Sequence, residues 1–135
     1  MSDTTHGVIH WNELNTHDAK AAMAFYGQTL GWTFEAMPTP DGSTYWLIKS
    51  GERMVGGIFE MVHPEFEGIP EHWFTHIAVD NIQQRVAAVK EHGGKITREP
   101  FVVPGVGTLA VLQAASGSYC AFIQPDNTIE GCGAG

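Results

Sequence analysis

The sequence predicts a single α+β domain over residues 1–135, made of two βαβββ modules related by a pseudo-twofold. The order strand, helix, strand, strand, strand occurs twice along the chain. The residues at the helix ends recur at a constant interval: Asp18 and Asp80, at the helix starts, are 62 residues apart, and so are Gly31 and Gly93, at the helix ends. A length of 135 residues suits one domain. Two such modules are expected to form curved mixed sheets that enclose a cleft lined by alternate strand residues.

The first module is expected over residues 7–62. It opens with the strand GVIHWNEL at residues 7–14, and a helix follows over residues 18–30. The helix is predicted from apolar residues at helical spacing, which are Ala22, Phe25, Tyr26 and Leu30. Thr16 or Asp18 can cap its start, and Gly31 can end it in the left-handed conformation. Strands are expected over residues 32–36, 43–49 and 53–61, with the turn sequences PTPDG and KSGER between them.

The second module is expected over residues 73–125, after a linker at residues 63–72 that contains two prolines. It starts with a strand over residues 73–79. The helix over residues 81–92 has Ile82, Val86 and Val89 on one face, and Gly93-Gly94 ends it. The remaining strands begin at residue 95 and continue over residues 108–113 and 118–124. Residues 126–135 are expected to form a flexible tail.

Composition excludes several classes of function. Seven Lys and Arg against fifteen Asp and Glu give a net charge of −8, so no basic patch is available to bind nucleic acid or an acidic membrane. No apolar run approaches the roughly 20 residues that span a bilayer, and the amino terminus does not resemble a signal peptide. Cys120 and Cys132 make no disulfide framework. A cytoplasmic protein is therefore expected.

Several motifs resemble the vicinal oxygen chelate superfamily, which includes glyoxalase I, bleomycin-resistance proteins and extradiol dioxygenases. In the first half these are W-x-E-L-x-T-x-D and A-x-x-F-Y-x-x-x-L-G-W. In the second half they are HIAVDN, EHGGKI and VPGVGTLAVLQAASGSYCAFIQP. The resemblance covers about residues 7–125, and it implies the paired βαβββ fold. It does not imply one activity, because the superfamily spans isomerases, dioxygenases, transferases and binding proteins.

The resemblance also implies where a metal would be bound, on the first and last strands of each module. Counting from the aspartates at the helix starts places these positions at Trp11, Phe74 and Ala121, and within one residue of Gly57. None of these side chains offers a lone pair to a divalent ion. No metal or other cofactor is therefore expected. The alternative is a divalent metal at relocated ligands drawn from a different set, namely His10, His63, His72 and Glu60.

Period-two alternation puts Trp11 and Glu13 on one face of the first strand, and Phe74 and His76 on one face of its counterpart. The pseudo-twofold makes Glu13 and His76 near equivalents that could meet across the cleft. A glutamate bonded to a histidine can act in general acid–base catalysis, so these two are the candidate catalytic residues. The alternative is a buried polar pair, or two groups that bind a ligand separately.

The candidate ligand-binding residues are those expected to line the cleft: Trp11, Glu13, Trp46, Phe74, His76, Tyr119 and Ala121. The leading hypothesis is a metal-independent protein that binds a small, largely apolar or planar molecule. The second is a lyase, isomerase or dioxygenase that uses Glu13 and His76 or relocated metal ligands. The third is a module that binds another protein. A homodimer is expected, without nucleic-acid or membrane partners.

Overall fold

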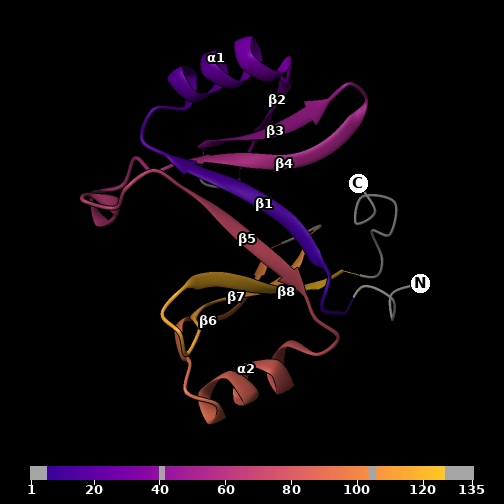
Figure 1. Ribbon diagram of the computed structural model, residues 1–135, viewed down its shortest axis with the longest axis vertical. Coiled ribbons are helices and arrows are strands. Elements are labelled where there is room, and N and C mark those ends of the chain that lie inside the picture. The colour runs from indigo at the N-terminus through magenta and orange to yellow at the C-terminus, as the bar shows by residue number, and fades with distance from the viewer. Residues whose placement is uncertain (1–5, 40–41, 104–105, 127–135) are drawn as a thin grey trace. The chain divides into compact units, whose positions relative to one another are not determined.

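The computed structural model describes residues 6–39, 42–103 and 106–126 of the chain. These residues divide into two compact units (Figure 1), and each is treated by itself. Among the described residues, the α1 unit comprises residues 11–39 and 42–74, and the α2 unit comprises residues 6–10, 75–103 and 106–126. None of the helices in the described residues is long and apolar enough to cross a membrane.

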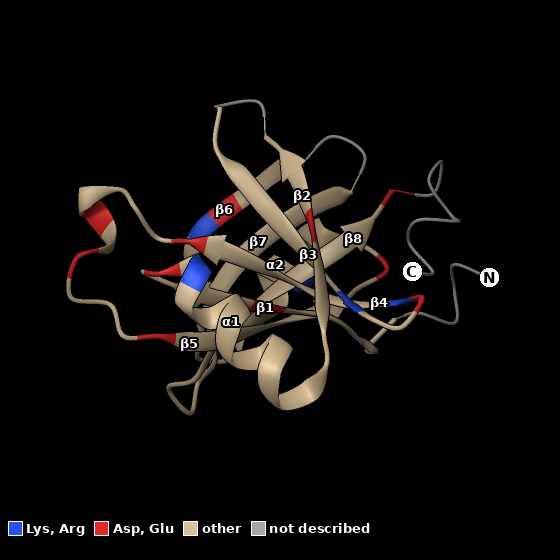
Figure 2. Cartoon of the chain, turned by 90° about the horizontal axis from the view of Figure 1, so that it is seen from above, with Lys and Arg blue, Asp and Glu red and all other residues tan. Residues whose placement is uncertain are grey.

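The α1 unit contains most of β1 (Ile9–Thr16), then α1 (Ala19–Leu30), β2 (Thr33–Pro38), β3 (Thr44–Ser50), β4 (Arg53–Glu60) and the short 3-10 helix η2 (Pro64–Phe66). The strand order is β2-β3-β4-β1. The β1–β4 pair is parallel and the other two pairs are antiparallel, so the sheet is mixed. Strand β5 (His72–Ala78) starts in this unit. Acidic residues recur between β4 and β5 (Figure 2), at Glu65, Glu67 and Glu71.

The α2 unit repeats this arrangement. It contains the end of β5, then α2 (Ile82–Glu91), β6 (Lys95–Val103), β7 (Gly107–Gln113) and β8 (Tyr119–Pro125). Its strand order is β5-β8-β7-β6, which corresponds strand by strand to the order β1-β4-β3-β2 in the α1 unit. The β5–β8 pair is parallel and the others are antiparallel. The prediction of an α+β chain with two βαβββ repeats is therefore confirmed.

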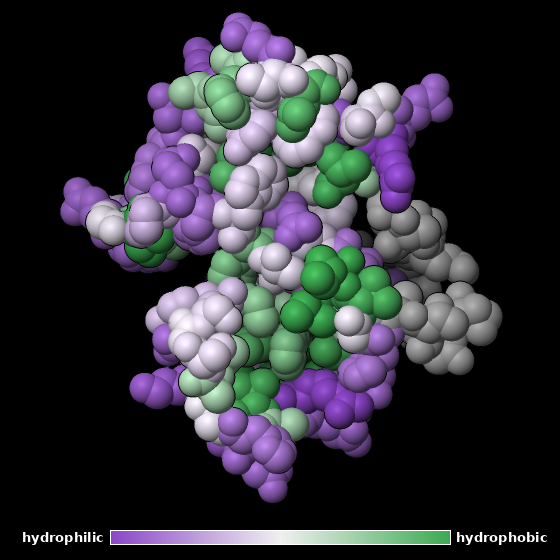
Figure 3. Space-filling model, in the orientation of Figure 1, coloured by the Kyte–Doolittle hydropathy of each residue, from purple (hydrophilic) through white to green (hydrophobic). Residues whose placement is uncertain are grey.

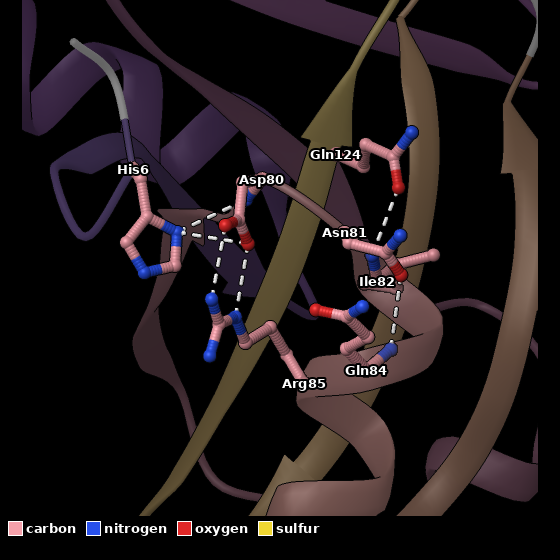
Figure 4. A network of polar contacts seen from close by, with 7 residues as sticks. All are labelled: His6, Asp80, Asn81, Ile82, Gln84, Arg85 and Gln124. Atoms are coloured by element: carbon pink, nitrogen blue, oxygen red, sulfur yellow. Dashed lines mark hydrogen bonds and ion pairs between the residues drawn. The ribbon is translucent and has the colours of Figure 1, made fainter. Parts of the chain in front are cut away.

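The helix ends follow from local sequence. The Asp18 carboxylate accepts a hydrogen bond from the Ala21 amide and caps α1, and Gly31 ends it with φ 75°. In the second repeat the cap is Asn81, whose side chain accepts from Gln84, rather than Asp80. Asp80 instead forms a bidentate ion pair with Arg85, and its pKa is lowered to about 2 mainly by that hydrogen bonding (Figure 4).

Residues before β1 are attached to the α2 unit by main-chain and side-chain bonds. The Gly7 amide donates to the Ala78 carbonyl at 2.7 Å, and the Ala78 amide donates to the Val8 carbonyl at 2.9 Å. The His6 ring lies 3.2 Å from the Asp80 carboxylate (Figure 4). These contacts explain why residues 6–10 belong with residues 75–126 and not with the helix that follows them in sequence.

Each unit has its own hydrophobic core beneath its helix. In the α1 unit a cluster of buried core residues is formed by Leu14, Ala19, Ile48 and Ile58. In the α2 unit they are Val79, Ile82, Val86 and Ala110. The helical spacing correctly indicated Ala22 and Tyr26 as core-facing, but Phe25 and Leu30 are 58% and 57% exposed. Other apolar side chains also reach the surface of both units (Figure 3), such as Val62 and Val102.

Candidate functional site

A chain of three polar side chains lies on one face of the α1 unit's sheet. The Trp11 indole Nε1–H donates to the Tyr45 hydroxyl at 3.0 Å. The Tyr45 hydroxyl in turn donates to Glu13 Oε1 at 2.9 Å. Trp11 and Glu13 are two residues apart on β1, so they project to the same side of the strand. The predicted common face of Trp11 and Glu13 is therefore confirmed, and Tyr45 joins them from β3.

Two glycines of β4 make this arrangement possible. Glu13 pairs with Gly57 in the parallel β1–β4 register, and a Cβ atom at position 57 would overlap the phenol of Tyr45. A Cβ at position 56 would meet the main-chain carbonyl of Asn12 on β1. Gly57 thus leaves the space that the tyrosine fills, and Gly56 allows the close approach of the neighbouring strand.

The environment changes the titration of both groups. Burial raises the pKa of Glu13 to about 7, although the hydrogen bond from Tyr45 acts in the opposite direction. Burial and the charge of Glu13 raise the pKa of Tyr45, so its hydroxyl keeps its proton. A carboxyl group that titrates near neutrality can accept or donate a proton under physiological conditions, which is a property shared by many binding and catalytic sites.

Among the other predicted lining residues, Trp46 is on the opposite face of the sheet, and the lining role of the rest stays a prediction. Trp46 packs against the core cluster that contains Leu14 and Ala19, so it lies on the helix side of the sheet, opposite Trp11 and Glu13. Phe74 contacts the His72 ring edge-to-face at 6.0 Å. In the α2 unit His76 is buried and is paired in register with Ala121, which is fully buried, whereas Tyr119 is 56% exposed.

Glu13 belongs to the α1 unit and His76 to the α2 unit. The pairing of these two side chains as acid and base therefore stays a prediction. Tyr45, which sequence reasoning did not single out, is the residue that contacts Glu13. The signal for it was present in the glycines of MVGGIFEM, because a glycine in a strand interior often marks the close approach of another group.

The residues present do not fit the metal site that the fold implies. Trp11 and Phe74 each stand seven residues before a helix cap, at Asp18 and Asn81, which supports the equivalence of the two positions. The indole of Trp11 has only a hydrogen-bond donor, and Tyr45 takes it. Phe74, Ala121 and Gly57 offer no side-chain ligand.

The residues of the alternative metal-ligand set do not form one group, and several of them contact other residues. The Glu60 carboxylate accepts from the Ala19 amide at the start of α1 at 2.9 Å, and His72 Nδ1 lies 2.7 Å from the Pro70 carbonyl. The His63 ring packs on Phe66. Burial lowers the pKa of His10. Among the described residues, no three His, Cys, Asp or Glu side chains are grouped so that they could hold a metal ion.

A hollow lies on the helix side of the same unit. It has a volume of about 470 Å³, and α1 and the start of β5 form its walls. Its apolar wall includes Tyr26, which stacks on Trp32 at 5.3 Å and meets Trp73 edge-to-face at 5.7 Å. Leu14 contributes to its floor, so this hollow and Glu13 are on opposite faces of β1.

Comparison with known proteins identifies the family. A family model described as the Glyoxalase/Bleomycin resistance protein/Dioxygenase superfamily matches residues 8–117. The chain belongs to this superfamily. The assignment confirms the resemblance to vicinal oxygen chelate proteins that the sequence motifs indicated.

Curated relatives are longer proteins. Two mycobacterial proteins named putative glyoxylase CFP32, from Mycobacterium bovis and Mycobacterium tuberculosis, are each 35% identical to this superfamily member over 119 residues. The matched region is 88% of this chain but only 44% of each relative. The chain therefore spans less than half the length of the curated relatives that it matches.

Solved structures share the fold at low sequence identity. A hypothetical protein from Bacillus halodurans has a TM-score of 0.68 at 20% identity, covering 87% of this chain and 94% of that one. Methylmalonyl-CoA epimerase from Mycobacterium tuberculosis has a TM-score of 0.66 at 10% identity, covering 91% of each chain. At these identities the similarity shows the fold alone.

Proposed function

We propose that this glyoxalase-superfamily chain binds a small, largely apolar or planar molecule at the Trp11–Tyr45–Glu13 face, without the metal that other members use. The observation that supports the proposal is the half-buried hydrogen-bonded chain itself, which places one titratable carboxylate beside an indole and a phenol. Aromatic walls with a few convergent polar groups are typical of small-molecule sites. At the positions where a metal would need ligands, the chain has side chains that cannot ligate.

The experiment is a two-dimensional NMR titration with planar aromatic fragments, using the Trp11 indole N–H resonance as the reporter. Substitution Trp11→Phe assigns that resonance, because it removes one indole N–H and keeps an aromatic ring. We expect fragments to shift the Trp11 resonance in metal-free buffer and to lose affinity at least tenfold in Glu13→Ala, since the polar anchor is gone.

Glu35→Gln is the matched control, because Glu35 lies on β2 of the same sheet with its side chain 58% exposed. It should bind as the wild type does. Fragments that shift the indole resonance of Trp73 and leave that of Trp11 unchanged would bind in the hollow beside α1, and would contradict the proposal. Binding that requires an added divalent ion would also contradict it.

A second candidate function is acid–base catalysis, and the pKa of Glu13, raised to about 7, favours it. Methylmalonyl-CoA epimerases have this fold, so the fold accommodates an epimerase. In this version Glu13 exchanges a proton with the ligand, and His76 is the predicted partner. An activity that survives the double substitution Glu13→Ala, His76→Ala would remove this candidate and leave the binding proposal standing.

A further inference from the structure

The three side chains of the site form a hydrogen-bond chain whose direction is fixed by chemistry. An indole nitrogen carries a hydrogen and has no lone pair to offer, so Trp11 can only donate to the Tyr45 oxygen. The Tyr45 hydrogen must then point away from Trp11, and it is directed at Glu13 Oε1 at 2.9 Å. While Glu13 is ionised, its Oε1 can only accept this hydrogen bond.

The second carboxylate oxygen is consequently the atom that faces a ligand. Oε1 accepts from the Tyr45 hydroxyl, which is the hydrogen bond that the carboxylate forms among the described residues, and Oε2 is left for a ligand. An ionised carboxylate is an acceptor at both oxygens, so Oε2 offers lone pairs and no hydrogen. The net charge of −8 on the chain also disfavours the approach of anionic ligands.

We propose that Tyr45 is the specificity-determining residue of this site: by fixing Glu13 Oε1 as its acceptor, it reserves Oε2 for a planar, uncharged ligand that presents an N–H or O–H donor. The inference rests on the proposed function, and it names the ligand class for that same site. Gly57 is required for this arrangement, because any larger residue at position 57 would displace the Tyr45 ring from Glu13.

Two probes that differ only at the donor test the ligand class. Uracil has ring N–H groups, and 1,3-dimethyluracil has the same planar ring with methyl groups in their place. At pH 8 the Glu13 carboxyl is mostly ionised. We expect wild-type protein to bind uracil about tenfold or more tightly than dimethyluracil, because a hydrogen bond to a charged acceptor is gained with one probe alone.

The substitution Glu13→Gln tests the role of Tyr45. A glutamine has one acceptor oxygen and one NH₂ group. If Tyr45 keeps the donor direction that it has toward Glu13, it holds the amide oxygen, and the NH₂ group takes the place of Oε2 and presents a donor. The variant is therefore expected to lose the preference for uracil and to bind dimethyluracil, whose carbonyl groups accept, at least as well.

The double substitution Glu13→Gln, Tyr45→Phe removes the hydroxyl that orients the amide. The glutamine can then turn its oxygen toward the ligand, and part of the preference for uracil should return. Gly57→Ala combined with Glu13→Gln should behave in the same way, since it displaces Tyr45. The Trp11 indole resonance shows in each variant that the sheet is folded.

The outcomes separate the inference from the function on which it rests. Equal binding of the two probes by wild-type protein, or no binding of uracil, overturns the ligand class. Identical preferences in Glu13→Gln with and without Tyr45→Phe overturn the role of Tyr45. The proposed function fails separately, if other planar fragments bind wild type and Glu13→Ala with the same affinity.

Discussion

Substituting Glu13 with glutamine is expected to stabilise the protein in a pH-dependent way. The folded state raises the pKa of Glu13 from 4.5 to about 7, so it binds the proton more tightly than the unfolded chain does. Below about pH 4.5 Glu13 is protonated in both the folded and the unfolded state, so it does not reduce the free energy of unfolding. As the pH rises from 4.5 to 7 the unfolded state ionises first, and the stability of the wild-type protein falls. Above pH 7 Glu13 is ionised in both states, and the free energy of unfolding is reduced by the full amount.

The magnitude follows from the shift. At 1.36 kcal/mol per pKa unit, the change from 4.5 to about 7 corresponds to about 3.4 kcal/mol. Glu13 is only partly buried, so water screens part of the cost, and we expect about 2 kcal/mol. For a chain of 135 residues this is about 7 °C in the melting temperature. Glutamine avoids the cost because it is uncharged and still accepts from Tyr45.

The assay is thermal unfolding followed by circular dichroism at pH 5 and pH 8. Glu13→Gln should melt about 7 °C above wild type at pH 8 and within about 2 °C of it at pH 5. Glu35→Gln, at an exposed position, should follow the wild type at both values. A stabilisation by Glu13→Gln that is equal at the two pH values would refute the reasoning, because it would not come from ionisation.

Three further outcomes follow from packing and ligand chemistry. Ile58→Ala should lower the free energy of unfolding by about 2–5 kcal/mol in urea titrations, because Ile58 is fully buried; Ile9→Ala, at a residue 64% exposed, should change it by less than about 0.5 kcal/mol. In a Cys132→Ser variant, Cys120 should react with a disulfide reagent at pH 8 several-fold more slowly in buffer than in denaturant, since burial raises its pKa. A chelator should leave the affinity for uracil unchanged, because Trp11 stands where a metal ligand is expected; a loss of affinity that zinc restores would contradict this.

Features that depend on neighbouring residues in the sequence could be predicted. The α1 cap and its end at Gly31 need only local chemistry: Gly31 was predicted correctly, and Asp18 is one of the two predicted caps, Thr16 and Asp18. For the second helix the sequence offers two side chains that can cap, Asp80 and Asn81, and the structure uses Asn81 because Asp80 is engaged by Arg85. The ion pair of Asp80 depends on Arg85, which lies more than one turn further along the chain, and rules for helix capping do not consider residues at that distance.

The candidate site could be predicted on β1 but not on β3. In a strand, side chains two residues apart point to the same side, so Trp11 and Glu13 could be assigned to one face of β1. The third strand reads TYWLIK, which is apolar on both faces, and a shift of one residue exchanges the faces. The structure settles the register in favour of Tyr45 beside Glu13, and it puts Trp46 in the core.

Helix amphipathicity was likewise only partly informative. Phe25 and Leu30 match the helical spacing, yet both are more than half exposed. Whether such a residue is covered depends on the width of the packing surface, and a single helix sequence does not carry that information.

The most direct measurement of the central claim is the titration of the Glu13 carboxyl carbon by ¹³C NMR, with and without uracil. The account predicts a midpoint near 7 in the free protein, and a lower midpoint with uracil because the ligand binds the ionised form. A midpoint near 4.5 that uracil does not move would show that Glu13 is an ordinary carboxylate. It would contradict both the polar anchor and the ligand class assigned to it.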